Sequence, residues 1–143
     1  MKLLVSACLL GCNCKYNGGN NFCQNVADFA RDKEVISVCP EVLAGLGTPR
    51  EPIEIRCGEV VRRDGTSVDS AIRSAVAQIL RELEGQEIDL AILKARSPTC
   101  GVKQVYDGTF TATLMVGNGV TADLLLHSGI AVYGESQVYE LLE

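Results

Sequence analysis

Three short apolar segments that each lead into a cysteine decide the fold of this chain. They are KLLVSAC at residues 2–8, EVISVC at residues 34–39, and LAILK at residues 90–94, which precedes Cys100. The segments are apolar throughout rather than alternating, which is typical of parallel strands buried on both faces. Strands are therefore predicted at residues 2–7, 34–38 and 89–94, with a fourth at residues 130–133.

Helix-like segments separate these strands. The clearest covers residues 67–84, where Ser67 can cap the start and Gly85 can end the helix. Shorter helices are predicted at residues 25–33 with Asn25 as the cap, at residues 121–127, and at residues 136–142. Alternating strands and helices predict an α/β fold: a compact, open, mainly parallel sheet with helices on both faces, which is Rossmann-like.

The remaining segments predict loops and smaller β elements. Residues 9–24 are rich in Gly and Asn, and residues 40–52 hold three prolines, so both predict long loops. Residues 53–63 predict a possible short hairpin. Residues 106–115 predict a turn at Asp107-Gly108 that is followed by a β-prone stretch at residues 109–113. No linker divides the chain, so a single domain over residues 1–143 is expected.

Composition narrows the range of functions. The chain has 47% hydrophobic residues, a net charge of −5 and no run of Lys or Arg, which argues against an extensive nucleic-acid surface. The apolar stretch before Cys8 is too short for a signal peptide, although VSAC at residues 5–8 resembles a lipoprotein cleavage box. A cytoplasmic location without membrane contact is therefore expected, where the seven cysteines stay reduced.

Three of the cysteines share one structural setting. Cys8, Cys39 and Cys100 each follow a predicted parallel strand, and the carboxyl ends of parallel strands meet at one side of a sheet. Three convergent thiols indicate a metal or redox site, although a buried Cys is also a common small core residue. No Cys-x-x-Cys pair supports structural zinc. Soft thiolates also bind iron–sulfur clusters, and a 4Fe–4S cluster held by three cysteines would leave one iron free for substrate.

Three ordered motifs extend this pattern along nearly the whole chain. They are SACLLG at 6–11 with CKYNG at 14–18, VCPEVL at 38–43 with TPR at 48–50, and LKARSPTCG at 93–101 with YDGTF at 106–110. Together they resemble the thiouracil desulfidase-like family of small iron–sulfur proteins. The resemblance implies a compact α/β domain, a 4Fe–4S cluster on Cys8, Cys39 and Cys100 with one open iron, and catalytic roles for Glu41 and Ser97.

The reaction implied by the resemblance is the non-redox, hydrolytic removal of sulfur from a thiolated uracil. The expected partner is a small thiopyrimidine, either thiouracil or a small thiouridine nucleotide, and sulfide is released. Glu41, two residues after Cys39, could move protons of the attacking water, or it could merely cap a turn. Ser97 could hold water or substrate, or it could belong to a Ser-Pro turn.

Other features leave alternatives open. The first motif ends in Asn17-Gly18 where the family usually has Asp-Gly, which affects a substrate contact or a turn. Cys12, Cys14 and Cys23 could complete a four-thiolate site with Cys8 in a non-catalytic metal- or cluster-binding module. Cys100 could instead carry persulfide in a thiol sulfur carrier. Further features have two interpretations each. Arg50, Lys94 and Lys103 could bind an anion or a carbonyl oxygen, or they could be solvated surface charges. Gly117-Asn118-Gly119 could be an anion cradle or a plain loop.

Overall fold

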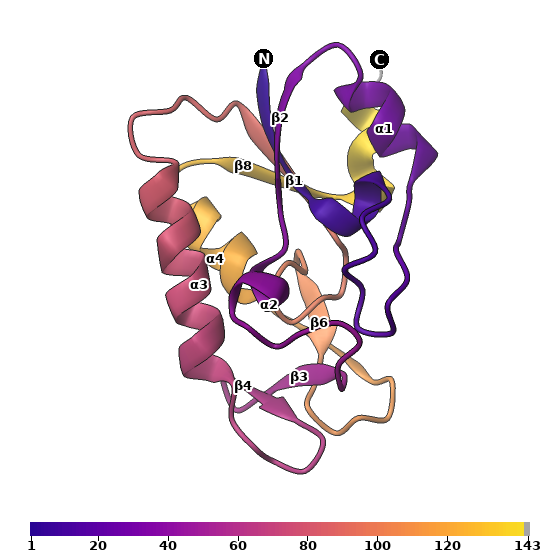
Figure 1. Cartoon of the computed structure of the whole chain (residues 1–143), viewed down its shortest axis with the longest axis vertical. Coiled ribbons are helices and arrows are strands. Elements are labelled where there is room, and N and C mark those ends of the chain that lie inside the picture. The colour runs from indigo at the N-terminus through magenta and orange to yellow at the C-terminus, as the bar shows by residue number, and fades with distance from the viewer. Residues whose placement is uncertain (142–143) are drawn as a thin grey trace.

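The computed structural model of the chain describes residues 1–141. Within these residues, four strands form a parallel sheet in the order β2-β1-β5-β8 (Figure 1). Their bounds are Lys2–Ser6 for β1, Glu34–Val38 for β2, Leu90–Leu93 for β5 and Ala131–Gly134 for β8. The predicted α/β class and the mainly parallel sheet are confirmed.

Helices cover both faces of this sheet because successive residues of β1 point in opposite directions. Leu3 and Val5 pack with α1 (Gln24–Ala30) and with the terminal 3-10 helix η2 (Glu135–Leu141). Leu4 packs on the other face with α3 (Asp69–Glu82) and α4 (Val120–His127). All three side chains are fully buried, and burial of each stabilises the fold by about 1.5–3 kcal/mol. The central strand therefore contributes to two core layers at once.

The predicted hairpin is present below the sheet and carries its own core. Strands β3 (Ile53–Arg56) and β4 (Glu59–Arg62) pair antiparallel. Cys57 and Gly58 join them with φ values of +51° and +79°, the left-handed conformation that tight hairpin turns require. Ile55 and Val60 pack with α3 in a third cluster of buried residues. A second antiparallel pair consists of β6 (Gln104–Tyr106) and β7 (Leu114–Val116).

Two predicted helix caps are wrong, and at Ser67 the reason is a tertiary contact that uses its hydroxyl group. Helix α1 begins at Gln24 after Cys23, so Asn25 lies inside the helix rather than at its cap. Helix α3 begins at Asp69 rather than at Ser67. The Ser67 hydroxyl donates to Glu59 Oε1 at 2.7 Å, and Asp69 Oδ1 accepts from the Val60 backbone N–H at 3.0 Å. These contacts attach the start of α3 to the hairpin.

The predicted loops contain short helices. Helix α2 (Pro40–Leu43) opens the segment predicted as a loop at residues 40–52, with Cys39 as its N-cap and Pro40 in its first turn. Proline is favourable there because the first-turn N–H groups lack helical partners. The 3-10 helix η1 (Ala7–Leu10) similarly follows β1 directly and overlaps the start of the predicted loop at residues 9–24.

The β-prone stretch at residues 109–113 does not form a strand; it is the loop between β6 and β7. Phe110 and Ala112 both have φ of +59°, which is incompatible with extended backbone. The threonine hydroxyls of the loop hydrogen-bond to one another instead of facing a sheet. At the other end of the chain, the helix predicted at residues 136–142 is the 3-10 helix η2, and Leu142 lies outside the described residues.

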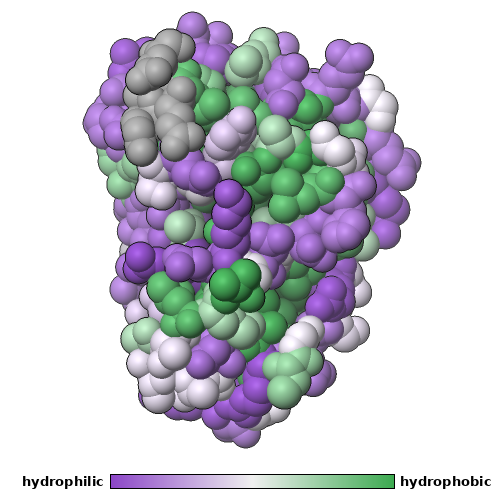
Figure 2. All heavy atoms as spheres, turned by 180° about the vertical axis from the view of Figure 1, so that it is seen from behind, coloured by the Kyte–Doolittle hydropathy of each residue, from purple (hydrophilic) through white to green (hydrophobic). Residues whose placement is uncertain are grey.

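The surface seen from behind is chiefly hydrophilic, with apolar residues gathered in an upper and a lower patch (Figure 2). Exposed apolar side chains are normal on folded proteins. No helix in the described part of the chain is long and apolar enough to cross a membrane.

Candidate active site

The three strand-end cysteines line one cavity of about 440 Å³. Cys8 lies in η1 directly after β1, Cys39 caps α2 directly after β2, and Cys100 lies in the loop after β5. Because β2, β1 and β5 are neighbours in the parallel sheet, their carboxyl ends bring these distant thiols to one side. Glu41 and Ser97 line the same cavity, so the structure brings together all five site residues predicted from the sequence.

Burial is the main influence on these thiols. It raises the pKa of Cys8, and the nearby Cys39 raises it further, while a hydrogen bond to Asn21 and the charge of Lys94 lower it. Burial also raises the pKa of Cys100 to about 12, against hydrogen bonds to Ser6 and Thr99 that lower it. Thiolates at these positions therefore need a positive partner, and a bound metal is one kind of group that can supply it.

The strand ends are tied together by Ser6, the last residue of β1. Its hydroxyl oxygen accepts a hydrogen bond from the Lys94 backbone N–H at 3.0 Å, directly after β5. The same side chain hydrogen-bonds the Cys100 thiol. Ser6 is 3% exposed, so this link lies inside the protein. The first and third motifs are thus joined through a serine immediately beside Cys8.

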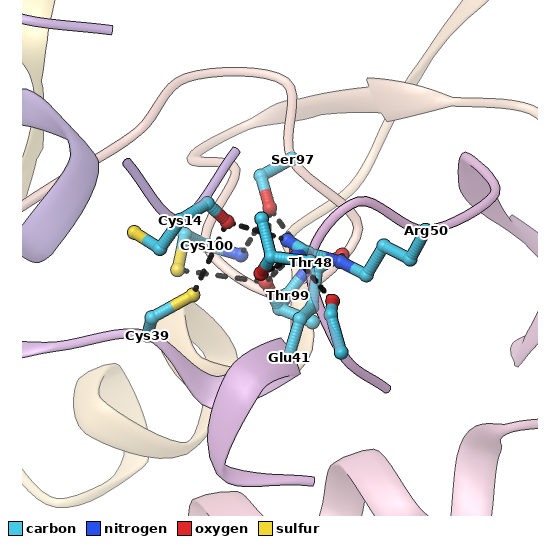
Figure 3. A network of polar contacts seen from close by, with 9 residues as sticks. Cys14, Cys39, Glu41, Thr48, Arg50, Ser97, Thr99 and Cys100 are labelled. Carbon is cyan, nitrogen blue, oxygen red and sulfur yellow. Dashed lines mark hydrogen bonds and ion pairs between the residues drawn. The ribbon is translucent and has the colours of Figure 1, made fainter. Parts of the chain in front are cut away.

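A polar network surrounds Glu41 on the wall of the cavity (Figure 3). Arg50 Nε lies 3.3 Å from Glu41 Oε1, and the two side chains are only 7% and 15% exposed. Arg50 also donates to the Cys14 carbonyl oxygen at 2.9 Å and to the Gly47 carbonyl oxygen at 3.0 Å. Arg50 is therefore neither a solvated charge nor a free anion-binding group: it holds the carboxylate of Glu41 in place.

Thr99 connects Glu41 with Ser97. The Thr99 hydroxyl donates to Glu41 Oε2 at 3.2 Å and lies 2.9 Å from Ser97 Oγ. Ser97 Oγ also accepts from the backbone N–H groups of Thr99 and Cys100, both at 3.2 Å. With those acceptor positions used, the Ser97 proton is directed to Thr99, whose own proton goes to Glu41. Ser97 thus has its predicted turn role and also lies at one end of a hydroxyl chain that ends at Glu41.

Lys94 lies on another part of the cavity wall, close to Cys8. Its ammonium group contacts Glu135 Oε1 at 2.9 Å, and Glu135 Oε2 accepts from the Ala95 backbone N–H at 3.0 Å. This pair fixes the chain after β5 to the start of η2. The positive charge of Lys94 is therefore partly balanced within the protein.

The donor set fits an iron–sulfur cluster. Cys8, Cys39 and Cys100 are free thiols on one cavity wall, and the sulfur atoms of Cys39 and Cys100 point toward one another in Figure 3. Thiolate is the ligand that such clusters use. Among residues 1–141, no group of three His, Cys, Asp or Glu side chains is arranged to hold a single metal ion. The four-thiolate alternative with Cys8, Cys12, Cys14 and Cys23 therefore lacks support, and Cys12 is exposed.

The structure bears on two other interpretations. A sulfur-carrier role for Cys100 requires a thiol of low pKa, whereas burial raises the pKa of Cys100. Asn17 Oδ1 accepts from the Gly19 backbone N–H at 2.9 Å, and Asn17 is not among the described residues that line the cavity. The departure from Asp-Gly at this position thus forms a turn rather than a substrate contact.

Sequence reasoning did not identify Thr99 or Glu54, although both line the cavity. Thr99 is 1% exposed and Glu54 is 8% exposed, which is unusual for polar side chains. Thr99 directly precedes Cys100 in the third motif, and this position next to a predicted ligand could have identified it as a site residue. Nothing near Glu54 in the sequence suggests a site, because its position at the cavity depends on how β3 packs against the distant turn at Gly108.

The fold and the site define a class of α/β proteins with a thiol-lined cavity at the carboxyl ends of a parallel sheet. The chain belongs to the 2-thiouracil desulfurase family, whose sequence profile matches residues 3–137. It is similar to "Uncharacterized protein YbbK" of Bacillus subtilis (strain 168), with 34% identity over 98% of this chain and 99% of that protein. It is also similar to the solved structure of the [4Fe-4S]-dependent thiouracil desulfidase TudS. That match has a TM-score of 0.90 and 37% identity, and it covers 99% of this chain and 95% of the other.

Proposed function

We propose that this protein is a desulfidase that removes sulfur from a thiolated uracil without net redox change and releases sulfide. The observation that carries the proposal is the convergence of Cys8, Cys39, Cys100, Glu41 and Ser97 on one cavity, in a chain whose whole length resembles a thiouracil desulfidase. The substrate is thiouracil or a small thiouridine nucleotide. Water supplies the oxygen that replaces sulfur, so the ring carbon keeps its oxidation state.

The cofactor is a 4Fe–4S cluster with Cys8, Cys39 and Cys100 as its protein ligands. With one iron free of protein ligands, such a cluster supplies a Lewis acid that prefers soft sulfur and polarises the C=S bond. The Ser6 side chain contacts Cys100 and the Asn21 side chain contacts Cys8, and each contact lowers the pKa of the thiol. These contacts orient the ligands and reduce the negative charge on their sulfur atoms.

Glu41 is the general base and acid of the reaction. Its carboxylate takes a proton from the attacking water and returns a proton to the departing sulfur. Arg50 and Thr99 fix the two carboxylate oxygens, so the group is positioned before substrate arrives. Ser97 lies at the far end of the same chain of hydroxyl groups, and by donating to Thr99, whose own proton goes to Glu41, it helps to keep the Glu41 carboxylate in its orientation.

Anaerobic reconstitution tests this function. We expect the protein loaded with iron and sulfide to release sulfide from 2-thiouracil, 4-thiouracil or their nucleotides. Alanine at Cys8, Cys39 or Cys100 should abolish both cluster loading and turnover, whereas Glu41→Gln should load the cluster and lose turnover. A matched control is Cys57→Asn, because Cys57 is an exposed hairpin residue at positive φ, where asparagine is well tolerated. A fully loaded protein that turns over none of these thiopyrimidines would contradict the proposal.

A further inference from the structure

Glu54 is a buried carboxylate in the cavity that the reaction described above does not use. On β3, its neighbours Ile53 and Ile55 belong to the buried cluster beneath the hairpin, although Ile53 also lines the cavity. Glu54 points to the other side of the strand and lines the cavity together with Tyr106. The residue is only 8% exposed, and no Lys, Arg or His within residues 1–141 forms an ion pair with it. A carboxylate in such a place needs hydrogen-bond donors.

The protein supplies two donors, both to the same oxygen. Glu54 Oε1 accepts from the backbone N–H groups of Gly108 at 3.0 Å and Phe110 at 3.1 Å. This turn cannot easily move, because a Cβ on Gly108 would lie 2.8 Å from the Ile55 carbonyl oxygen and 2.9 Å from Arg56 Cα. Arg56 also donates twice to the Gly108 carbonyl oxygen, at 2.8 and 3.0 Å. The Glu54 carboxylate is therefore held in one orientation.

The second oxygen, Oε2, accepts no hydrogen bond from the described residues. Within residues 1–141, the side-chain polar atom that is both sealed from solvent and without a hydrogen-bond partner is Thr121 Oγ1. Glu54 Oε2 has no partner either, but it is not sealed from solvent. Oε2 therefore keeps some access to solvent, and Glu54 is one of the residues that line the cavity. A fixed, ionisable acceptor with an unused oxygen is suited to bind an N–H group of a ligand.

We infer that Glu54 is the substrate-binding residue that recognises the pyrimidine ring, with Oε2 accepting a hydrogen bond from the ring N3–H. This inference rests on the proposed function. N3 lies between C2 and C4, so its N–H is adjacent to sulfur whether the substrate is a 2-thio or a 4-thio compound. Each oxygen of Glu41 already accepts one hydrogen bond, from Arg50 or from Thr99, and its remaining lone pairs serve proton transfer, so we assign recognition of the ring to Glu54. The two carboxylates thus have different roles: Glu41 transfers protons, and Glu54 selects pyrimidine rings with an unsubstituted N3.

Binding of the reaction product tests this role without turnover. Isothermal titration calorimetry of the cluster-loaded protein compares uracil with 3-methyluracil, which lacks the N3–H. Glu54→Gln is the informative variant, since its amide oxygen can still accept from Gly108 and Phe110 while its NH₂ group replaces Oε2. Arg56→Met is the matched control, because it removes two hydrogen bonds to the same turn but keeps the Glu54 side chain and its own donors, the N–H groups of Gly108 and Phe110.

We expect the wild-type protein to bind uracil at least about tenfold more tightly than 3-methyluracil. Glu54→Gln should weaken uracil binding by about tenfold or more and change 3-methyluracil binding little. Arg56→Met should affect both ligands equally. The inference is overturned if the wild type binds the two ligands equally or binds neither detectably. It is also overturned if Glu54→Gln keeps the wild-type preference for uracil over 3-methyluracil. Sulfide release from thiouracil, assayed on the same samples, reports separately on the proposed function.

Discussion

At the scale of single residues, the site depends on side chains that hold other side chains. Glu41 and Ser97 belong to different motifs, and the Thr99 hydroxyl lies between them at 3.2 and 2.9 Å. Arg50 holds the opposite oxygen of Glu41. Such partners fix a reacting group in one orientation, and their removal typically costs about 10–100-fold in activity.

Thr99→Val tests whether this connection matters. Valine has nearly the same shape but no hydroxyl, so Glu41 Oε2 and Ser97 Oγ lose their shared partner. We expect kcat for sulfide release to fall about tenfold to a hundredfold, with iron content and KM close to wild type. Thr99→Ser restores the hydroxyl and should recover most of kcat. Equal impairment of the valine and serine variants would show that packing, and not the hydroxyl, is what the site requires.

The sequence could predict the cysteines of the site but only part of the polar network. Cys8, Cys39 and Cys100 each end an apolar strand, so the topology alone brings them together. Arg50 does not follow a strand of the parallel sheet, and its pairing with Glu41 depends on how residues 44–52 fold back against the Cys14 carbonyl oxygen. Glu54 depends on contacts with the turn at Gly108, and such contacts leave no local pattern.

At the scale of elements, the approach of α4 to the cysteine loop determines where Cys100 lies. Gly119, the N-cap of α4, packs against this loop, and its N–H donates to the Gly101 carbonyl oxygen at 2.8 Å. A Cβ at Gly119 would lie 2.6 Å from the Cys100 backbone nitrogen. The Gly117-Asn118-Gly119 segment thus serves close backbone packing, which explains its glycine at residue 119 without an anion.

Gly119→Ala should therefore displace the Cys100 loop. We expect the variant to lose most of its bound iron and to be destabilised by about 1–3 kcal/mol, as is typical of overpacking. Iron analysis and urea unfolding provide the two measurements. Gly117→Ala is the control, because a Cβ there would meet only Val105 Cγ2, at an ordinary 3.6 Å. Normal iron content in Gly119→Ala would mean that the loop can adjust without loss of the cysteine position.

The elements whose positions could be predicted from the sequence were those with a strong pattern of apolar residues. Strand β2 was predicted at residues 34–38 and is observed there, since its boundaries coincide with charged and proline residues. Helix α2 was missed because Pro40 signals a break in sequence, whereas at the first turn it favours a helix. The start of α3 was misplaced because Ser67 bonds Glu59 on another element. Each error arose where a tertiary contact or a position-dependent residue overrode the local signal.

At the scale of the whole molecule, β1 links the two core layers that flank the sheet. Leu4→Ala tests this link, because Leu4 is fully buried between β2, β5 and the helices α3 and α4. We expect the free energy of unfolding of the cluster-free protein to fall by about 2–5 kcal/mol in urea. Val35→Ala on the edge strand β2, where Val35 is 36% exposed, should change it by well under about 1 kcal/mol. Similar losses for both variants would contradict the central role assigned to β1.

Removal of the cluster should also lower stability across the molecule. The three proposed ligands follow β1, β2 and β5, and a cofactor that binds only the folded state stabilises it. We expect the loaded wild-type protein to have a higher Tm than the same protein after chelation of its iron, measured anaerobically by circular dichroism. Cys39→Ala treated in parallel should show no such difference. An identical Tm for loaded and stripped wild type would mean that the thiols are arranged independently of the cofactor.

The position of Cys100 also has a consequence for biosynthesis. A nascent chain that has left the ribosome only as far as β4 contains Cys8 and Cys39, while β5 and the loop that carries the third thiol have yet to be translated. Under the proposed ligand set, insertion of the cluster is therefore expected only after β5 has been translated. An amino-terminal fragment that ends before that point lacks the third proposed ligand.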